Sequence, residues 1–353
     1  MPPQLHYAAG RTMISAAVPG LDPRDVEAFT KAGYWRTDSL GDIIYRHAQD
    51  NPAGTAFIEG DERLTWADYE RRSSEIAGLI IDAGARRGEL VGVMLPDAPL
   101  VHIIFQAAEK AGVTVVGIGA RAGEREIGHL LSKAKATAFI TEATHRGQNM
   151  AALVGRLRRD GVSITKHIVV APDSRRPVDD ELQEHIRRRK LGPNDLWLLN
   201  TTSGTTGLPK QVMQFQNRWF TFHQLAAEAG ALTSNDVFMS IIPAPFGFGL
   251  WTAHFTPSIL GAPTVLMSRY ETEGALDLIE RERVTVLMCV STQFIMMLNS
   301  PSSRKRDLSS LRVMFTGGEA IPYERAAEFE DRVGARVLQF YGSNETGALS
   351  YTT

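Results

Sequence analysis

A cluster of hydroxyl groups and glycines follows an apolar run in the middle of the chain. Residues 197–210 read WLLNTTSGTTGLPK. Glycines let successive backbone N–H groups point into one concavity, the hydroxyls add donors, and the lysine adds a positive charge. A polyphosphate needs such groups around it, so the segment predicts a strand that leads into a phosphate-binding loop. A surface linker rich in Ser, Thr and Gly is the alternative, which the apolar run directly before the cluster disfavours.

This loop differs from the Walker A loop, which requires G-x-x-x-x-G-K-[ST]. Leu208 and Pro209 separate Gly207 from Lys210, and no Ser or Thr follows the lysine. A phosphate-loop NTPase or kinase is therefore disfavoured, and hydrolysis of ATP to ADP rather than AMP would revive it.

Two later segments also carry glycines and polar side chains directly after predicted strands. Residues 316–322 read TGGEAIP, which taken alone is an ordinary tight turn before a helix. Residues 341–347 read YGSNETG, where Tyr341 offers an aromatic face for a planar base and Glu345 a hard oxygen ligand for Mg²⁺. Packing and capping are the alternatives for a lone Tyr and a lone Glu.

The elements that must position these segments alternate between strand-like and helix-like patterns. Strands are expected at 91–95, 113–119, 137–141, 167–171, 196–201, 236–242, 263–268, 284–290, 311–316 and 336–341, after a hairpin at 56–66. Helices are expected from 40, at 66–85, 100–111, 124–136, 150–159, 216–229, 249–260, 274–282, 291–299 and 322–333. Such a pattern predicts an α/β fold of two packed, mostly parallel sheets flanked by helices, with a cleft at the carboxyl ends of the strands.

The chain is expected to begin with a partly ordered lead-in over residues 1–37. Residues 172–195 are rich in charge and proline, which favours a solvated connection between a subdomain at 38–190 and another at 191–353.

Gly117, Gly119 and Gly123 resemble a dinucleotide fingerprint, but their spacing is G-x-G-x-x-x-G rather than G-x-G-x-x-G. No acidic residue at the end of a second strand is placed to hold a ribose, so a Rossmann dehydrogenase is disfavoured.

The bulk composition is that of a soluble globular protein, with 43% hydrophobic and 22% charged residues. A net charge of −2 gives no electrostatic argument for nucleic acid or an anionic membrane, and no apolar run approaches the ~20 residues of a membrane span.

Cys289 is the single cysteine and lies in an apolar run, which favours a buried strand residue over a nucleophile. With no secretion signal at the start, we expect a cytoplasmic protein, and a homodimer is compatible with the sequence.

The segment TTSGTTGLPK resembles the signature phosphate loop of the adenylate-forming superfamily, which includes acyl- and aryl-CoA synthetases, peptide-synthetase adenylation domains and firefly luciferase. Residues 341–347 are similar to the Y-G-x-T-E motif of that family, with Asn344 in place of the usual Thr, and residues 316–320 to its adenine-binding turn. The resemblance implies that a carboxylate attacks the α-phosphorus of ATP, with Mg²⁺ present. The acyl-adenylate then passes its acyl group to coenzyme A.

The resemblance also implies roles for individual residues. Phosphate contacts fall at Thr202, Ser203, Gly204, Thr205, Thr206, Gly207, Lys210 and Asn344, and adenine contacts at Gly317, Gly318, Glu319, Tyr341 and Gly342. Lys210 and Glu345 are the expected catalytic residues, with Glu345 as the Mg²⁺ ligand.

The segment IPAPFGFGLW at 242–251 matches a family turn, P-x-x-H-x-x-G, that walls the acyl pocket, with Phe246 at the His position. The expected acyl pocket comprises Phe246, Phe248, Gly249, Trp251, Phe294 and Ser343, although core packing alone could explain each aromatic residue. Residues 32–48 are similar to aryl-acid and alicyclic-acid ligases. The expected substrate is therefore a bulky hydrophobic acid, aryl, alicyclic or terpenoid, of secondary metabolism.

Two features depart from the family pattern. Gln211 replaces the Gly that normally follows the loop lysine, and the sequence stops before the family's ribose-binding aspartate and small lysine-bearing domain. We therefore expect the larger part of an acid–CoA ligase's first domain, with impaired turnover. The alternatives are a module that binds ATP or acyl-adenylate, and transfer of the acyl group to a carrier protein or an amine.

Overall fold

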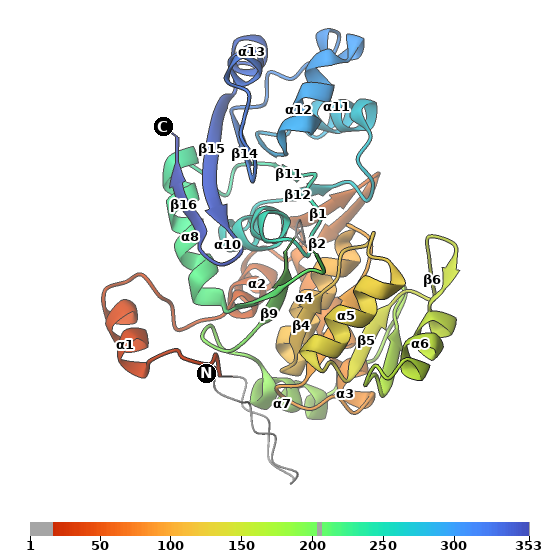
Figure 1. Ribbon diagram of the computed structural model, residues 1–353. Helices are drawn as coiled ribbons and strands as arrows, with labels where there is room; N and C mark the ends of the chain where they lie inside the picture. Colours follow the sequence, from red (N-terminus) through yellow and green to blue (C-terminus); the bar gives the residue numbers. More distant parts are fainter. Residues whose placement is uncertain (1–16, 203–206, 353) are drawn as a thin grey trace.

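Two packed sheets form the framework of the computed structural model, which describes residues 17–202 and 207–352 (Figure 1). The larger sheet has eight strands in the order β16-β15-β14-β13-β11-β12-β1-β2, and the smaller has six in the order β10-β9-β4-β3-β5-β8. Neighbouring strands run parallel except at three sheet edges, where β2, β10 and β16 pair antiparallel. The expected α/β fold with two mostly parallel sheets is confirmed.

The strands and helices of the smaller sheet come mainly from the first half of the chain. They are β3 (Leu90–Met94), β4 (Thr114–Gly117), β5 (Ala138–Thr141), β8 (Lys166–Val169), β9 (Leu198–Thr201) and β10 (Gln211–Gln214), with α3 (Trp66–Asp82), α4 (Pro99–Ala111), α5 (Glu124–Ala134), α6 (Met150–Arg159) and α7 (Asp180–Arg189). A two-stranded ribbon, β6 (Thr144–His145) with β7 (Gln148–Asn149), lies beside them.

The larger sheet and its helices take up most of the second half. The strands are β1 (Thr55–Glu59), β2 (Glu62–Thr65), β11 (Phe238–Ser240), β12 (Thr264–Leu266), β13 (Val286–Met288), β14 (Val313–Gly317), β15 (Arg336–Ser343) and β16 (Gly347–Tyr351). The helices are α1 (Pro23–Lys31), α2 (Leu40–Asp50), α8 (Gln216–Gly230), α9 (Gly247–Gly249), a π-helical segment η1 (Leu250–Phe255), α10 (Thr256–Leu260), α11 (Thr272–Arg281), α12 (Ser291–Asn299), η2 (Pro301–Arg304) and α13 (Tyr323–Val333).

The expected division at residue 190 does not follow the sheets. β1 precedes this residue but pairs with β12 in the larger sheet, where Phe57 lies opposite Thr264. β9 follows it but pairs with β4 in the smaller sheet, where Leu198 lies opposite Val115. Each half of the chain therefore contributes strands to the sheet of the other half.

The expected lead-in and the expected connection at 172–195 each contain a helix. Within 172–195, Asp179 accepts a hydrogen bond from the Leu182 backbone at 2.8 Å and begins α7, which buries Leu182. Within the lead-in, Asp22 caps α1 and Pro23 opens it. The segment 172–195 thus contains a capped helix whose charged side chains are mostly exposed, with Leu182 as its buried residue.

Helix α4 lies between the two sheets, in contact with β4 and β1, and nearly all its side chains are buried. A stack of four rings crosses the same region from one sheet to the other. His102 lies 4.9 Å from Phe57 and 5.5 Å from His254, and Trp197 follows at 5.8 Å from His254, all within 15° of parallel. Burial lowers the pKa of His102 to about 3 and that of His254 well below its ordinary value, so both rings are neutral packing groups.

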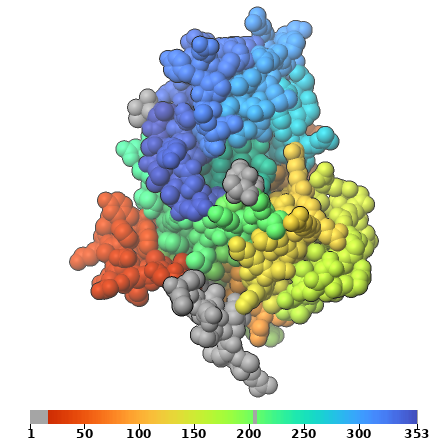
Figure 2. Space-filling model, viewed as in Figure 1, coloured from red at the N-terminus to blue at the C-terminus, as the bar shows by residue number. Residues whose placement is uncertain are grey.

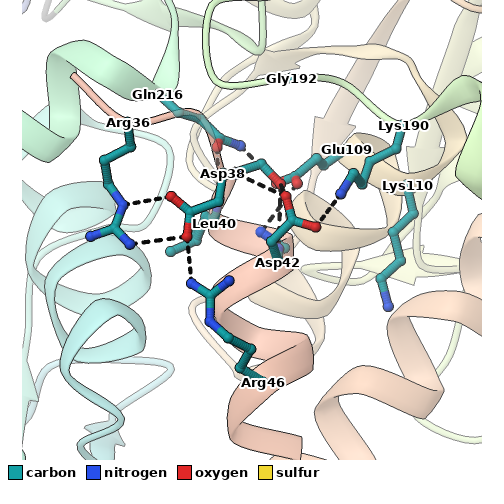
Figure 3. Close-up of polar contacts among 12 residues, drawn as sticks. Arg36, Asp38, Leu40, Asp42, Arg46, Glu109, Lys110, Lys190, Gly192 and Gln216 are labelled. Atoms are coloured by element: carbon teal, nitrogen blue, oxygen red, sulfur yellow. Dashed lines mark hydrogen bonds and ion pairs between the residues drawn. The ribbon is translucent and has the colours of Figure 1, made fainter. Parts of the chain in front are cut away.

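A polar network joins α4 to α2, α7 and α8 (Figure 3). Buried Glu109 accepts hydrogen bonds from the Gly41 backbone at 3.1 Å and from Gln216 Nε2 at 2.7 Å. Gln216 Oε1 in turn accepts from the Leu40 backbone at 2.8 Å. Nearby, Lys190 pairs with Asp42. The network fixes the start of α8.

Candidate active site

A cleft of about 730 Å³ lies where the loops after β11, β14 and β15 face the end of β9. Figure 2 shows the face on which the last part of the chain, in blue, adjoins the green middle of the chain. The lining residues come from both sheets and from α8: Thr202, Leu208, Lys210, Trp219, Phe222, Ile242, Phe246, Gly247, Phe248, Trp251, Val290, Thr292, Gly317, Gly318, Glu319, Phe340, Gly342, Ser343, Asn344, Glu345, Gly347 and Ala348. Twelve of these 22 residues were among the expected site residues and ten were not. The cleft lies at the ends of strands, where the site was expected.

The two ends of the expected phosphate loop are held together by backbone and hydroxyl contacts. The Thr202 backbone N–H donates to the Lys210 carbonyl at 3.0 Å, and the Lys210 N–H donates to Thr202 Oγ1 at 3.1 Å. Gly207 has a φ of 154°, which residues with a side chain rarely adopt. Lys210 is exposed at the cleft, and Ser203, Gly204, Thr205 and Thr206 lie outside the described residues.

The glycine turn after β14 is tied to α12. Glu319 Oε1 accepts from the Ser291 backbone at 3.1 Å and from Ser291 Oγ at 2.6 Å. A Cβ on Gly317 would lie 2.6 Å from the ring and carbonyl of Phe340, so this position requires glycine. Gly318 has a φ of 83°, which also favours glycine. The turn therefore presents bare backbone to the cleft.

The turn after β15 carries Asn344 and Glu345 and is held from β9, β10 and α8. Asn344 Nδ2 donates to the Thr201 carbonyl at 3.1 Å. The Asn344 carbonyl accepts from Gln214 Nε2 at 2.8 Å and from Arg218 Nη2 at 3.0 Å. Burial lowers the pKa of Arg218, and the charge of Glu345 opposes that shift. The guanidinium thus lies near the carboxylate that was expected to bind metal.

Aromatic side chains also line the cleft. Phe248 lies 4.6 Å from Phe340 and 5.9 Å from Trp251, measured between ring centroids. Trp219 and Phe222 of α8 complete the wall and, like Gln214 and Arg218, were not predicted. Their signal in the sequence is an aromatic-rich helix directly after the phosphate loop, which is equally typical of core packing.

Besides Gly207, three expected site residues are absent from the cleft lining. Phe294 is fully buried between α12 and α13, with its ring 5.8 Å from Phe329, and is absent from the cleft lining, because α12 turns this apolar face to the core. Tyr341 is 70% exposed and also outside the lining. Gly249 lies beneath the surface, where a Cβ would come within 2.2 Å of the Pro243 carbonyl oxygen, so its role is close backbone packing.

The donor set suits a magnesium ion held together with phosphates. Glu345 is an exposed carboxylate in the cleft, whereas Glu319 is engaged by Ser291. Among residues 17–202 and 207–352, no three His, Cys, Asp or Glu side chains form a group that could hold a metal. Mg²⁺ is usually held by one or two carboxylates plus substrate phosphates. One glutamate beside the expected phosphate loop can provide such a carboxylate.

Among residues 17–202 and 207–352, no helix has the length and apolar character needed to cross a membrane.

Comparison with known proteins agrees with this arrangement. The family described as AMP-binding enzyme matches residues 44–353. The chain belongs to this family. Feruloyl-CoA synthase of Amycolatopsis sp is 29% identical over 312 residues, which are 88% of this chain and 60% of that protein. 4-Coumarate–CoA ligase 1 of Oryza sativa subsp. japonica is 30% identical over 301 residues, 81% of this chain and 53% of that protein.

The fold is also that of solved members of the adenylate-forming superfamily. The anthranilate CoA ligase AuaEII in complex with anthranoyl-AMP superposes with a TM-score of 0.77 at 21% identity, covering 90% of this chain and 61% of that protein. The resemblance drawn from the phosphate loop and the YGSNETG segment is thereby confirmed. The chain spans about 60% of the length of the relatives that it matches.

Proposed function

We propose that this chain is the nucleotide- and acid-binding part of an AMP-forming acid–CoA ligase. In this function a bulky hydrophobic carboxylic acid reacts with ATP to give an acyl-adenylate and pyrophosphate, and the thiol of coenzyme A then takes the acyl group. The supporting observation is that one cleft is lined both by Thr202, Lys210 and Glu345 and by aromatic rings.

The residues of the cleft account for the first step. A carboxylate oxygen of the acid forms a bond to the α-phosphorus, and the bond from that phosphorus to the pyrophosphate oxygen breaks. Bringing a carboxylate to a polyanion is costly, and Lys210 offsets this by placing a positive charge where phosphate charge gathers. Asn344 keeps its amide beside the end of β9, which suits a contact to the α-phosphate. Glu345 would hold Mg²⁺, whose charge neutralises phosphate oxygens when bound.

The aromatic wall favours an acid with a ring. Phe246, Phe248, Trp251, Trp219 and Phe222 offer flat apolar surfaces, which gain more from a ring than from a thin chain. Relatives that are named for feruloyl, coumarate and anthranilate groups support the same class. Straight-chain acids should therefore be activated far less well than aryl or alicyclic acids.

Acid-dependent exchange of pyrophosphate into ATP tests the first step, with calorimetric binding of a non-hydrolysable aryl-adenylate analogue measured in parallel. We expect both with the wild type, and about tenfold weaker binding of Mg·ATP in Lys210→Ala, because the variant loses a charge at the phosphates. Lys133→Ala is the matched control, since Lys133 is an exposed lysine of α5 that is absent from the cleft lining.

Three results would redirect the proposal. Binding without exchange would identify a module that holds the adenylate but does not form it. Exchange without thioester formation would point to a carrier protein or an amine as the acceptor. Absence of both exchange and analogue binding would contradict the proposed function.

A further inference from the structure

A loop of the larger sheet rests on the carboxyl edge of the smaller one. Residues 243–246 follow β11 and lead into α9, and they end in Phe246, which lines the cleft. The Ala244 backbone N–H donates to Asp97 Oδ1 at 2.5 Å, and the Pro245 carbonyl accepts from Asn200 Nδ2 at 2.9 Å. Asp97 follows β3, and Asn200 lies within β9. Two side chains of the smaller sheet thus fix the backbone of this loop.

Glycines at the end of β4 make room for the same loop. A Cβ on Gly117 would lie 3.1 Å from Pro245 Cβ. A Cβ on Gly119 would lie 3.3 Å from Phe246 Cζ and 3.7 Å from Cε2. By contrast, nothing lies within 4 Å of a Cβ on Gly123. The first two glycines of the G-x-G-x-x-x-G pattern are therefore explained by close packing against residues 245 and 246.

We propose that Asp97, Gly117, Gly119 and Asn200 form a seat for Phe246, and that Gly119 is a specificity-determining position that sets the width of the acyl site. The inference rests on the proposed function, because it takes the acyl group to lie along Phe246. The absence of a side chain at Gly119 lets the Phe246 ring stand back from the cleft. An acid with a wide ring system then fits beside it.

The direction of the effect follows from the contacts. A Cβ on Gly119 would contact the Phe246 ring, and Phe246 lines the cleft whereas Gly119 does not. The loop backbone is held by Asp97 and Asn200, so a ring pressed from the Gly119 side moves toward the cleft. A contact of 3.3 Å is tighter than most Cβ contacts, so even a methyl group requires a shift. Gly119→Ala should narrow the site slightly and Gly119→Val more.

Asp97 acts through the loop and is a positioning residue. Asparagine keeps the acceptor oxygen that the Ala244 N–H requires, whereas alanine removes it. Asp97→Asn should therefore retain the preference for wide acyl groups, and Asp97→Ala should reduce it. If the two variants show the same preference for wide acyl groups, Asp97 does not position Phe246.

The deciding experiment is calorimetry with two non-hydrolysable acyl-adenylate analogues, one bearing a two-ring aryl group and one bearing an acetyl group. Gly119→Val should weaken binding of the aryl analogue tenfold or more and leave the acetyl analogue unchanged, in line with the discrimination that one or two methyl groups give in apolar pockets. Gly123→Ala, the matched control, should alter neither. Equal weakening of both analogues, or no change in either, would overturn the inference.

A double variant and a crystal structure of Gly119→Val test the packing of Phe246 on Gly119 independently of the proposed function. Phe246→Ala removes the ring, so adding Gly119→Val to it should cost no further affinity for the aryl analogue. A crystal structure of Gly119→Val should show the Phe246 ring displaced toward the cleft, whatever the ligand. If the wild type binds neither analogue, the proposed function fails. An undisplaced ring overturns the seat itself.

Discussion

Arg218 is the residue through which α8 reaches the strand-end turn of the cleft. Its Nη2 donates to the Asn344 carbonyl at 3.0 Å, its Nη1 donates to Gln214 Oε1 at 3.0 Å, and its guanidinium lies 5.6 Å from the centroid of the Phe222 ring. The planar guanidinium group can donate to both oxygens and lie over the ring at once, whereas the ammonium group of a lysine acts as a point charge. Arg218 therefore holds the backbone that precedes Glu345.

We expect Arg218→Ala to weaken binding of an aryl-adenylate analogue about tenfold, because the Asn344 carbonyl loses a charged donor worth about 1.5–3 kcal/mol. Arg218→Lys should recover little of the loss. Arg187→Ala is the control, since Arg187 is a largely exposed partner of Glu184 on α7 and such pairs contribute little. Calorimetry on the three variants would contradict this role if Arg218→Ala bound the analogue as the wild type does.

At this scale, residue type and spacing predicted several polar residues that the structure places in the cleft lining. Thr202, Lys210 and Glu345 could be found because clusters of small and polar residues directly follow apolar strands. Arg218 and Trp219 could not, because a helix that turns aromatic and charged side chains inward looks the same whether it faces a core or a cleft. Phe294 is the converse case. Its spacing on α12 fits a core face as well as a pocket wall, and the structure places it in the core.

Helix α8 is the element that connects the cleft to the interior. It lies beside β16 (Figure 1), its middle lines the cleft with Trp219 and Phe222, and its first residue, Gln216, joins the buried network around Glu109. Gln216 both donates to Glu109 and accepts from the Leu40 backbone, so its amide satisfies two buried partners.

Gln216→Ala should lower the free energy of unfolding by about 3 kcal/mol, because it leaves a buried carboxyl group and a buried N–H without this partner. Gln224→Ala on the exposed side of the same helix should change it by less than about 0.5 kcal/mol. Urea unfolding of both variants measures the difference. Similar midpoints would mean that water or a neighbouring group replaces the amide.

Element types could be predicted where burial is continuous, and sheet membership could not. β3, β4 and β5 are apolar runs buried on both faces, which is the strongest strand signal available. β10 and β16 are edge strands with partly exposed side chains, so they lack that signal and were missed. β1 pairs in the larger sheet and β9 in the smaller one, although each comes from the other half of the chain. Local sequence patterns do not encode which strand will be the neighbour.

At the scale of the whole molecule, a stack of four rings spans the space between the two sheets. Phe57 belongs to the larger sheet and Trp197 directly precedes β9 of the smaller one, while His102 and His254 lie between them. Neutral imidazole rings pack there as flat groups. A protonated ring would place an unpaired charge among apolar neighbours, which is strongly unfavourable.

This burial predicts a loss of stability in mild acid. The pKa of His102 is about 3 in the folded protein, whereas a histidine in the unfolded chain titrates near 6.5, so the unfolded state binds more protons between these values. Stability is therefore unaffected by this group above pH ~6.5 and falls by about 1.4 kcal/mol per pH unit below it. At pH 5 the loss from His102 is about 2 kcal/mol relative to pH 7.

Urea unfolding of the wild type and His102→Phe at pH 7 and pH 5 isolates this contribution, because other titrating groups are common to both proteins. Phenylalanine keeps a flat ring in the stack and cannot take up a proton, so its loss of stability between the two pH values should be smaller by about 2 kcal/mol. His185→Phe on the exposed face of α7 should show the same pH dependence as the wild type. An equal acid loss in His102→Phe would mean that the folded protein accommodates a charge at this position, and that the two sheets are not held by neutral rings.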